Sequence, residues 1–599
     1  MSIDLTGLTP EQILDYESKR RPSIWSQRHT KLRGQTYRFE RLDSTGSLVL
    51  EKKQLRLQRK FLQQPLDDQH AWKSFQKSRQ CGASENHVRE CLWFADTHPY
   101  TKQAYIFPTF DQVADFSKTR IEEVMKDSPY LSRRMGIDPV TKKKLQGFDV
   151  VDNVRLRRVG ESFIFFRSGH TPKSGEGIDI DILYLDEVDR MNPKTTTAFN
   201  EALAASAYGW RRDISTPSLP GVGVNASFQR SDQHHWWMKC PHCNHYFTLV
   251  LDEDYGLVDL PIDTRGRPNH SLHLTYDFIE EDDTHAFACP KCRAFVSNET
   301  RILGFWHPLH EYNKRVRGYQ ISQLICPWIS ATDIVNKKED FKIEQLWMNY
   351  VIGLPYLGDN VLVTRNDIYG CIDRSLTNPY DLARDGLALG GDWGDTSWLV
   401  VGMNHPDGSG RVIIMDILSV SDREAIRQEN GTKDNPHIRE FANKMRQWNV
   451  DKAVLDGGYG KDKNWELLNQ FPGRVYSCFY PSIGSASTKT FQDAWSEQDN
   501  KVSVDRTMTL KIATQMFVKR RVVIPEWVAS NPLFDTFVKH VTNLVSIKDI
   551  EEDQETRTEL LTERIGSLPG GDHLGHAWNY LTIALRNTKA TESHSDFFM

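Results

Sequence analysis

Long apolar segments are absent from this sequence, and their absence excludes several classes of protein. The first 20 residues are mostly polar and contain no apolar stretch of the kind found in a signal peptide. No run approaches the roughly 18 apolar residues that a membrane span requires. We therefore expect a soluble protein that acts inside a cell, without a membrane partner.

An excess of charge of one sign is also missing, and cysteine is scarce. The formal net charge is −5 over 599 residues, so nucleic-acid binding would have to rely on local basic surfaces. The basic clusters at 19–21 and 133–144 are candidates, although each also fits an ordinary solvated face. Nine cysteines would be an odd basis for a disulfide framework in so long a chain, and four of them form two CxxC pairs. This pattern favours a metal site in a reducing compartment.

Internal repeats and low-complexity tracts are missing as well, so local patterns must reveal the organisation. The length allows roughly three or four domains. Short apolar runs alternate with amphipathic stretches between about 73 and 230, which predicts an α/β class with a parallel sheet wrapped by helices. The predicted regions are an N-terminal helical region at 1–60, an α/β domain at 61–330 with a small inserted cysteine module at 235–300, a helical connection at 331–385, a second strand-rich domain at 386–586 and a polar tail at 587–599.

An apolar strand that ends in two adjacent carboxylates indicates nucleotide hydrolysis. Residues 181–187 read Asp-Ile-Leu-Tyr-Leu-Asp-Glu. In an ATPase, Asp186 would hold Mg²⁺ on the phosphates, and Glu187 would orient and deprotonate the attacking water. The same residues also fit a buried strand that runs into an acidic turn.

A glycine-containing loop lies upstream of this strand, but it departs from the standard phosphate-binding pattern. In Gln76-Lys-Ser-Arg-Gln-Cys-Gly-Ala-Ser84 the first glycine is missing, and alanine occupies the usual lysine position. Gly82 would still allow the backbone to approach phosphate, and Ser84 could bind Mg²⁺. The lysine charge could come from Lys77, and Arg79 could act in cis on the γ-phosphate.

A short strand that ends in two hydroxyl side chains follows at Asp213-Ile-Ser-Thr-Pro217. In motor ATPases such a segment senses the γ-phosphate and couples hydrolysis to movement, which would be the role of Ser215 and Thr216. A simple Ser/Thr turn before proline accounts for the same residues.

The two cysteine pairs predict a structural zinc site. Cys240-Pro-His-Cys243 and Cys289-Pro-Lys-Cys292 are separated by 45 residues. Each turn can aim two thiolates at one tetrahedral ion, and four sulfur ligands leave no open position for catalysis. The gap exceeds the usual spacing of roughly 15–20 residues, so an insertion must loop out between the halves. Four reduced cysteines without metal are the alternative.

Three acids lie at predicted strand or helix ends in the second half of the chain. Asp392 and Asp456 each follow an apolar strand, and Asp572 lies near the start of an apolar helix. Together they could hold two Mg²⁺ or Mn²⁺ ions about 4 Å apart, one to activate water and one to stabilise the leaving 3′-oxygen. Each acid alone also fits a turn or cap residue, and Asp572 would be a reasonable N-cap.

In their order these segments resemble the large subunit of tailed-phage terminases, specifically the lambda GpA type. The resemblance spans nearly the whole chain. It is carried by Pro22-Ser-Ile-Trp-Ser-Gln-Arg-His29, Lys77-Ser-Arg-Gln-Cys-Gly-Ala-Ser84, Phe107-Pro-Thr109, Leu185-Asp-Glu-Val-Asp-Arg190, Ser215-Thr-Pro217 and Cys240-Pro-His-Cys243.

The resemblance implies a P-loop ATPase domain, an inserted zinc-ribbon-like module and a C-terminal ribonuclease H-like nuclease domain. In this family the loop lysine is often displaced to the position of Lys77, and Gln58 matches a glutamine that reads adenine. The nucleotide-binding residues implied in this way are Lys77, Ser78, Gln80, Gly82, Ser84, Asp186, Ser215, Thr216 and Gln58, with Glu187 and Arg79 catalytic.

The nuclease half departs from the family pattern at one position. Many members carry an acid just before the alanine of the last helix, where this sequence has His576. We therefore assign the third metal ligand to Asp572, beside Asp392 and Asp456. Three further residues are auxiliary candidates: His573, His576 and Asp395.

The function implied by the resemblance is that of a viral DNA-packaging motor in the host cell cytoplasm. Such a motor hydrolyses ATP to move double-stranded DNA into a procapsid and cuts concatemeric genomes. The implied partners are DNA, a terminase small subunit at the N-terminal helices, a portal protein at the C-terminal tail, and further copies of the chain in a ring.

Two other functions fit parts of the sequence. A cellular DNA translocase or helicase fused to a repair nuclease would share the chemistry, but it should show further helicase motifs after Thr216. A non-catalytic zinc-bearing scaffold with a degenerate P-loop would have no need of both Asp186 and Glu187.

Overall fold

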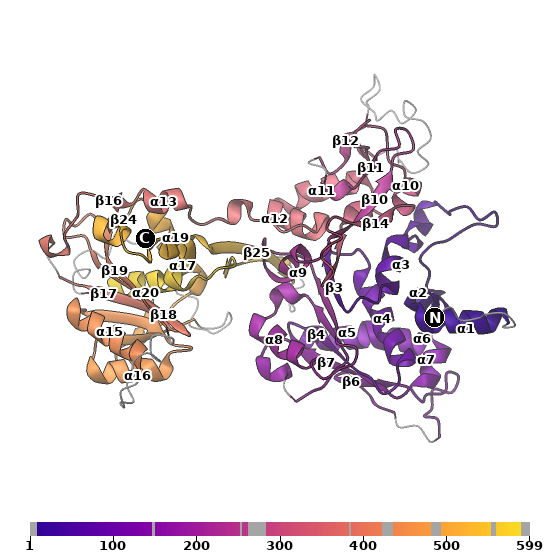
Figure 1. Cartoon of the computed structure of the whole chain (residues 1–599), viewed down its shortest axis with the longest axis horizontal. Helices are drawn as coiled ribbons and strands as arrows, with labels where there is room; N and C mark the ends of the chain where they lie inside the picture. The colour runs from indigo at the N-terminus through magenta and orange to yellow at the C-terminus, as the bar shows by residue number, and fades with distance from the viewer. Residues whose placement is uncertain are drawn as a thin grey trace. The chain divides into compact units, whose positions relative to one another are not determined.

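The computed structural model divides the chain into two compact units, Met1–Tyr356 and Leu357–Met599 (Figure 1). Each unit has its own apolar core. None of the described helices is both long and apolar enough to cross a bilayer. The structure describes residues 9–146, 150–175, 177–251, 254–260, 283–382, 385–421, 435–480, 493–552 and 559–588.

The first unit is built on an 11-stranded sheet whose centre is parallel. The central strands are buried on both faces, as expected of a parallel sheet covered by helices. In spatial order the strands are β11 (Tyr246–Phe247), β10 (His234–Lys239), β15 (Arg317–Ile321), β3 (Trp72–Lys77), β9 (Trp210–Ser215), β8 (Ile182–Asp186), β4 (Lys102–Phe107), β7 (Ser162–Ser168), β6 (Leu156–Val159) and β5 (Asp152–Asn153), with β14 (Phe305–Pro308) beside β10.

Helix α4 (Ala83–Thr97) follows β3 and is buried along most of its length. The other helices of this unit are α1 (Pro10–Arg20), α2 (Pro22–His29), α3 (Lys60–Asp67), α5 (Phe110–Phe116), α6 (Glu123–Asp127), α7 (Pro129–Arg134), α8 (Pro193–Glu201), α9 (Gly223–Gln229), α10 (Asn298–Ile302), α11 (Ala331–Phe341) and α12 (Glu344–Trp347). Two small hairpins complete it, β1 (Lys31–Leu32) with β2 (Gln35–Thr36), and β12 (Leu257–Asp259) with β13 (His285–Phe287).

The second unit contains a nine-stranded mixed sheet. Strands β19, β18 and β17 are antiparallel neighbours, whereas β20, β21 and β23 continue the sheet in parallel from β17. The order is β16 (Ile372–Asp373), β24 (Val522–Pro525), β19 (Val412–Ser421), β18 (Thr396–Asn404), β17 (Ala388–Asp392), β20 (Lys452–Asp456), β21 (Val475–Phe479), β23 (Lys501–Ser503) and β22 (Ala494–Ser496).

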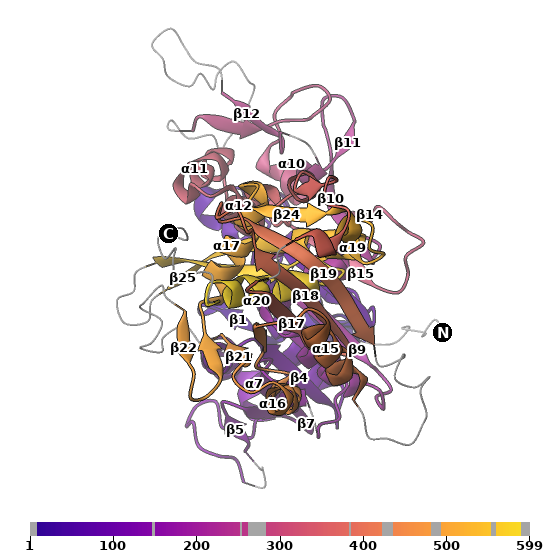
Figure 2. The same ribbon diagram turned by 90° about the vertical axis from the view of Figure 1, so that its left-hand side faces the viewer.

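Helices cover both faces of this second sheet, and each face has its own apolar cluster. α15 (Pro436–Gln447) and α16 (Lys461–Gln470) lie on one face, and α20 (His573–Leu585) crosses the other (Figure 2). A Cβ on Gly390 would lie 2.0 Å from the carbonyl oxygen of Ala577, so glycine permits this close packing of β17 against α20. The remaining elements are α13 (Arg365–Tyr369), α17 (Arg506–Val518), α18 (Glu526–Ala529), α19 (Phe534–Thr542) and the hairpin β25 (Leu544–Glu552) with β26 (Glu559–Ser567).

The predicted α/β class and parallel sheets are confirmed. Several features add to the sequence picture. The segment at 235–300 begins as β10 of the main sheet, and α11 and α12 of the expected connection belong to the first unit. The described part of 1–60 contains a hairpin between its helical segments. Residues 1–8 and all but the first two residues of the 587–599 tail lie outside the described residues.

Candidate functional site

Three strand ends of the first unit meet at one edge of the sheet. Strands β3, β9 and β8 are parallel neighbours and end at Lys77, Ser215 and Asp186. Gln76 pairs with Ser215, and Asp186 pairs with Ile214, so the three ends lie at nearly the same level. The carboxyl edge of an open parallel sheet is where α/β proteins bind ligands.

The loop after β3 has the backbone of a phosphate-binding turn despite its unusual sequence. Gln80 and Gly82 both adopt positive φ angles, 56° and 84°, and Gly82 caps the N-terminus of α4. Ser84 lies in the first turn of that helix, where free backbone N–H groups favour an anion. The geometry therefore fits the predicted nucleotide loop.

The start of this loop is held from a distant part of the first unit. The Ser78 amide donates to the carbonyl of Ile321 at 2.7 Å, and the Arg79 amide donates to that of Tyr350 at 2.8 Å. A Cβ on Gly353 would lie 2.9 Å from the Ser78 nitrogen, so only glycine allows this approach. The Arg79 guanidinium stacks on the Tyr350 ring, 3.4 Å from its centroid.

Asp186 is almost completely buried and is oriented by two hydrogen bonds. Its carboxylate accepts from the Tyr105 hydroxyl and from the Glu187 amide, both at 3.1 Å. Burial raises the pKa of Asp186 to about 6, although the charge of Lys77 opposes this shift. A buried carboxylate near a lysine and a phosphate-type loop fits the donor set for Mg²⁺ bound with ATP.

Glu187 is half-buried and is oriented separately from Asp186. It adopts a left-handed backbone conformation, φ 60°, which turns it away from the strand. Gln112 donates to its carboxylate at 2.9 Å. Gln112 also closes a capping box with Thr109 at the start of α5. Gln112 was not predicted from the sequence, where the T-x-x-Q pattern after Phe107 was the available signal.

The hydroxyl segment after β9 is tied to the turn after β8. The Ser215 hydroxyl accepts from the Asp189 amide at 3.4 Å and donates to the Thr216 carbonyl at 3.0 Å. The Asp189 carboxylate accepts from the amide and hydroxyl of Ser218 at 2.8 and 2.7 Å. A shift of either segment would therefore move the other.

The structure gives Gln58 a different environment from the other predicted nucleotide residues. Its side chain is buried, donates to the carbonyls of Arg41 and Val49, and accepts from the Arg41 amide. These bonds fasten the chain at 41–49 to the turn before α3. These contacts favour a structural role for Gln58 over adenine binding.

The four cysteines of the CxxC pairs come together as predicted. Their sulfur atoms all lie within 4.8 Å of one another, with Cys240 to Cys292 at 3.7 Å and Cys243 to Cys289 at 3.8 Å. A tetrahedral zinc site with Zn–S bonds of about 2.3 Å requires sulfur separations of about 3.8 Å. The four thiolates fit a structural Zn²⁺.

The two cysteine turns have matching backbones. In each, the residue after the second cysteine is left-handed, Asn244 at φ 56° and Arg293 at φ 58°. Its amide donates back to the carbonyl of the first cysteine, at 3.0 Å and 2.9 Å. The turns therefore present their sulfurs in the same way from two distant parts of the chain.

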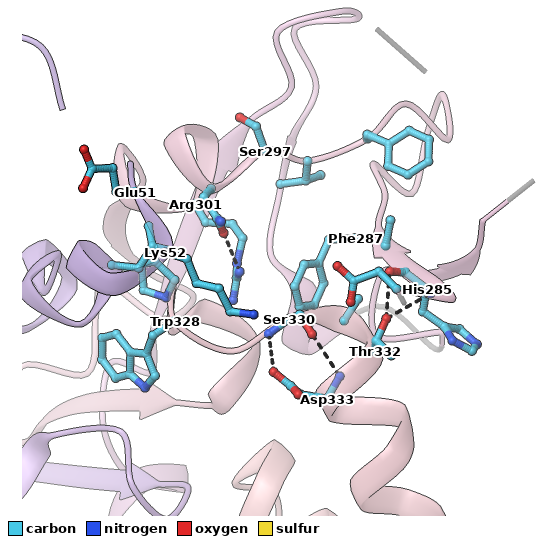
Figure 3. Close-up of a pocket in the computed structure, with 18 of the residues that line it drawn as sticks. Glu51, Lys52, His285, Phe287, Ser297, Arg301, Trp328, Ser330, Thr332 and Asp333 are labelled. Carbon is cyan, nitrogen blue, oxygen red and sulfur yellow. Dashed lines mark hydrogen bonds between the residues drawn. The ribbon is translucent and has the colours of Figure 1, made fainter. Parts of the chain in front are cut away.

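A cavity of about 780 Å³ is lined by residues of β13, of α10 and of the start of α11 (Figure 3). Phe287 and Trp328 contribute apolar walls, and Ser330 and Asp333 form the capping box of α11 at its edge. The buried Arg301 donates to the carbonyls of Leu324, Cys326 and Ile329. These bonds join α10 to the turn before α11, which indicates that Arg301 is structural.

Two of the three predicted nuclease acids end neighbouring strands in the second unit. β17 and β20 are parallel and end at Asp392 and Asp456. Burial raises the pKa of Asp392, and the charge of Asp456 raises it further, while a 2.8 Å hydrogen bond with His573 opposes the shift. Asp456 accepts from the amides of Gly458 and Tyr459 at 3.1 and 3.0 Å.

Asp572 occupies the N-cap position of α20 but makes no capping hydrogen bond. It contacts His576 at 3.3 Å and accepts from the Ser567 hydroxyl. Although burial opposes it, these contacts hold the pKa of Asp572 well below its usual range. Asp395 is exposed.

The acids form a looser arrangement than the cysteines. Among the described residues, only the four cysteines bring three or more ligand atoms within 4.8 Å of one another. A Mg²⁺ site does not require such crowding, because the ion keeps several waters and takes only one or two protein carboxylates beside the substrate phosphates. The carboxylates of Asp392, Asp456 and Asp572 are the donors that suit Mg²⁺ or Mn²⁺.

The comparisons with known structures find large terminases. The large terminase of bacteriophage HK97 is 12% identical, with 94% of this chain and 99% of that chain covered and a TM-score of 0.47. A large terminase from a thermophilic bacteriophage, in complex with ADP, is 10% identical, with coverages of 86% and 94% and a TM-score of 0.27. A nuclease domain of Sf6 gp2 is 9% identical, with coverages of 38% and 98% and a TM-score of 0.24.

A family model gives the decisive comparison. No curated protein matches the chain. The model described as "Phage terminase large subunit gpA, ATPase domain" matches residues 62–306, which include the loop at 77–84, the Asp186–Glu187 pair and all four zinc-type cysteines. This match assigns residues 62–306 to the gpA-type ATPase domain of phage terminase large subunits.

Proposed function

We propose that this terminase subunit hydrolyses ATP to move double-stranded DNA into a procapsid and cuts concatemeric DNA with its second unit. The observation that carries the ATPase part is the meeting of Lys77, the Gly82 loop and Asp186 at one sheet edge. The family match supports the packaging role. A host cell's cytoplasm is where such a subunit would act.

In the proposed ATPase cycle, the loop amides and Lys77 bind the phosphates of ATP. Asp186 and Ser84 would hold Mg²⁺, which neutralises charge on the transferred phosphoryl group. Glu187, oriented by Gln112, accepts a proton from the attacking water. Ser215 and Thr216 would pass the change in phosphate contacts to the turn after β8 through the Asp189 bond.

Replacing the proposed base tests the ATPase mechanism. In the Glu187→Gln variant the side chain keeps its size and can still contact Gln112, but its amide cannot accept the proton of the attacking water. We expect ATP turnover to fall by about 100-fold or more while nucleotide binding is retained, as general-base losses of this kind usually show. Glu201→Gln, on the exposed end of α8, is the matched control and should turn over ATP normally. Turnover retained by Glu187→Gln would remove this mechanism.

The second unit is proposed to be a ribonuclease H-like nuclease. Three antiparallel strands are followed by parallel ones, and Asp392 and Asp456 end the two strands where the direction changes. Asp572, with His573 and His576 nearby, would complete the set of ligands for two Mg²⁺ or Mn²⁺ ions, which supply activated water and stabilise the leaving oxygen. The third ligand follows from its position at the start of α20.

Cleavage of supercoiled plasmid in Mn²⁺ without ATP tests the nuclease. We expect the full-length protein to cut the plasmid. The Asp456→Asn variant should cut at least about 100-fold more slowly, because the metal site loses one of its ligands. Asp451→Asn, an exposed acid just before the same strand, is the control. Cutting that survives Asp456→Asn would refute this assignment.

The proposed partners follow from the family and not from a contact in this structure. They are a terminase small subunit at α1 and α2, a portal protein at the 587–599 tail, and further copies of the chain that form a ring around DNA. Deletion of 588–599 without loss of portal binding would exclude the tail as the docking segment.

A further inference from the structure

The spacing of Asp392 and Asp456 is not fixed by the strand ladder alone. The last paired residues of β17 and β20 are Gly391 and Leu455, one residue before each acid. The two acids therefore lie just beyond the last pair between these two strands, although each still pairs with its outer neighbour, Asp392 with Trp398 and Asp456 with Cys478. A contact that joins these two chain segments directly would help to fix the distance between the two acids.

The side chain of Asn464 bridges the two segments. It lies on α16, and its Oδ1 accepts from the indole nitrogen of Trp393, the residue after Asp392, at 2.8 Å. Its Nδ2 donates to the backbone carbonyl of Asp456 at 2.8 Å. The same amide nitrogen donates to the Ser477 hydroxyl on β21 at 3.0 Å. One side chain thus links the ends of β17 and β20 to the middle of β21.

Trp393 is held rigidly enough to transmit this link. Its ring stacks on Phe441 of α15 with centroids 4.2 Å apart. The chain at Gly460 also passes so closely that a Cβ on this glycine would lie 1.7 Å from the indole. Trp393 and Asn464 are each only 3% exposed, so water cannot replace either hydrogen bond without rearrangement.

The chemistry of this position requires an amide. Asn464 accepts one hydrogen bond and donates two, and its donors are both used. A carboxylate would repel the Asp456 carbonyl, and an aliphatic chain would leave the buried Trp393 nitrogen unpaired. A side chain that only stabilised a turn or capped a helix would not need hydrogen bonds to the ends of two strands, as Asn464 has.

We propose that Asn464 is a positioning residue that sets the distance between the two acids of the metal site. This inference rests on the proposed nuclease function. Asn464 does not touch the reacting atoms, and it acts through the backbone of Asp456 and the residue next to Asp392. Residues that orient metal ligands in this way commonly change metal affinity or activity by about 10- to 100-fold when they are replaced.

The test uses full-length protein, with Mn²⁺ as the probe. Asn464→Leu removes all three hydrogen bonds at nearly constant volume, and Trp393→Phe removes only the indole donor and keeps the ring on Phe441. We expect the Mn²⁺ concentration for half-maximal plasmid cleavage to rise by about 10-fold or more in Asn464→Leu, and by less in Trp393→Phe. Asn469→Leu, an exposed amide on the same helix, is the control and should match the wild type.

A merely structural loss would lower the amount of active protein without moving the half-saturating Mn²⁺ concentration. Assays are therefore run well below the thermal midpoint of each variant. Half-saturation within twofold of the wild type in both variants would overturn the inference. If the wild type does not cut DNA, the nuclease proposal fails instead. The positioning role of Asn464 can then still be tested by measuring Mn²⁺ binding with electron paramagnetic resonance. Equal Mn²⁺ affinity in wild type and Asn464→Leu would then overturn the positioning role.

Discussion

Among single residues, Asp186 shows a conflict between stability and function. Its carboxyl is buried with a pKa of about 6, above the 3.8 of an exposed aspartate. The folded protein therefore binds this proton more tightly than the unfolded chain does. The free energy of unfolding should fall as pH rises between about 4 and 6, and the ionised carboxylate should cost up to about 3 kcal/mol at neutral pH.

This conflict predicts opposite effects of Asp186→Asn on stability and turnover. In protein without nucleotide or added Mg²⁺ at pH 7.5, the free energy of unfolding of the first unit should rise by up to about 3 kcal/mol, and the gain should shrink toward pH 4. ATP hydrolysis should be lost because an amide is a poor Mg²⁺ ligand. Urea unfolding without nucleotide or added Mg²⁺ at several pH values measures the first effect. An equal loss of stability at all pH values would contradict the explanation.

Which site residues the sequence reveals depends on where their partners lie. Asp186, Asp392 and Asp456 were predicted because each follows an apolar strand, and strand ends are visible in a single sequence. Gln112 and Asn464 were not, because the residues that they orient lie more than 70 residues away or across a helix–sheet contact. Their own neighbourhoods look like ordinary helix starts.

At the level of secondary-structure elements, α4 is fastened to the sheet by a buried ionic network. Glu90 accepts from Lys73 on β3 at 2.8 Å and from Arg212 on β9 at 3.0 Å, and all three side chains are almost fully buried. The helix that begins at the nucleotide loop is thereby held against the two strands that flank it. The pKa of Glu90 is lowered despite its burial, because both cations favour the carboxylate.

Breaking this network should destabilise the first unit strongly. Glu90→Gln leaves two buried cations without an anion, which typically costs about 3–5 kcal/mol. Chemical denaturation followed by circular dichroism measures the change, with the exposed Glu201→Gln as the control. A loss below about 1 kcal/mol would show that the network contributes little.

The elements themselves were predictable to different degrees. The buried strands β8 and β4 were expected from continuous apolar runs, as in parallel sheets. The pairing of β15 with β3, and of β10 with β15, was not, because β10 leads into the cysteine module and β15 follows it, so both look like part of an insertion. Periodicity identifies strands, but it does not identify their neighbours when more than 200 residues intervene.

For the whole molecule, the two units have separate cores and should unfold separately. The cysteines Cys240 and Cys289 belong to the large core of the first unit, whereas the acids Asp392 and Asp456 lie in the second. Calorimetry of the full-length protein should therefore resolve two transitions. We expect about one zinc per chain by elemental analysis, since four thiolates form one site.

Ligand removal should distinguish the two transitions. Cys289→Ser should lose the zinc and lower only the transition of the first unit, because metal-binding energy is folding energy for that site. Mn²⁺ should raise only the transition of the second unit by preferential binding to its folded state. A single transition that responds to both changes would contradict independent unfolding.

The partner strand of β3 has a consequence for anyone who isolates the ATPase domain. The family match ends at residue 306, but β15, which pairs with β3 along five residues, spans Arg317–Ile321. The carbonyls that anchor the phosphate loop belong to Ile321 and Tyr350. A fragment cut at 306 would expose the edge of the strand that carries Lys77 and would tend to aggregate through it. An expression boundary at or after Tyr356 keeps both the strand and the anchor.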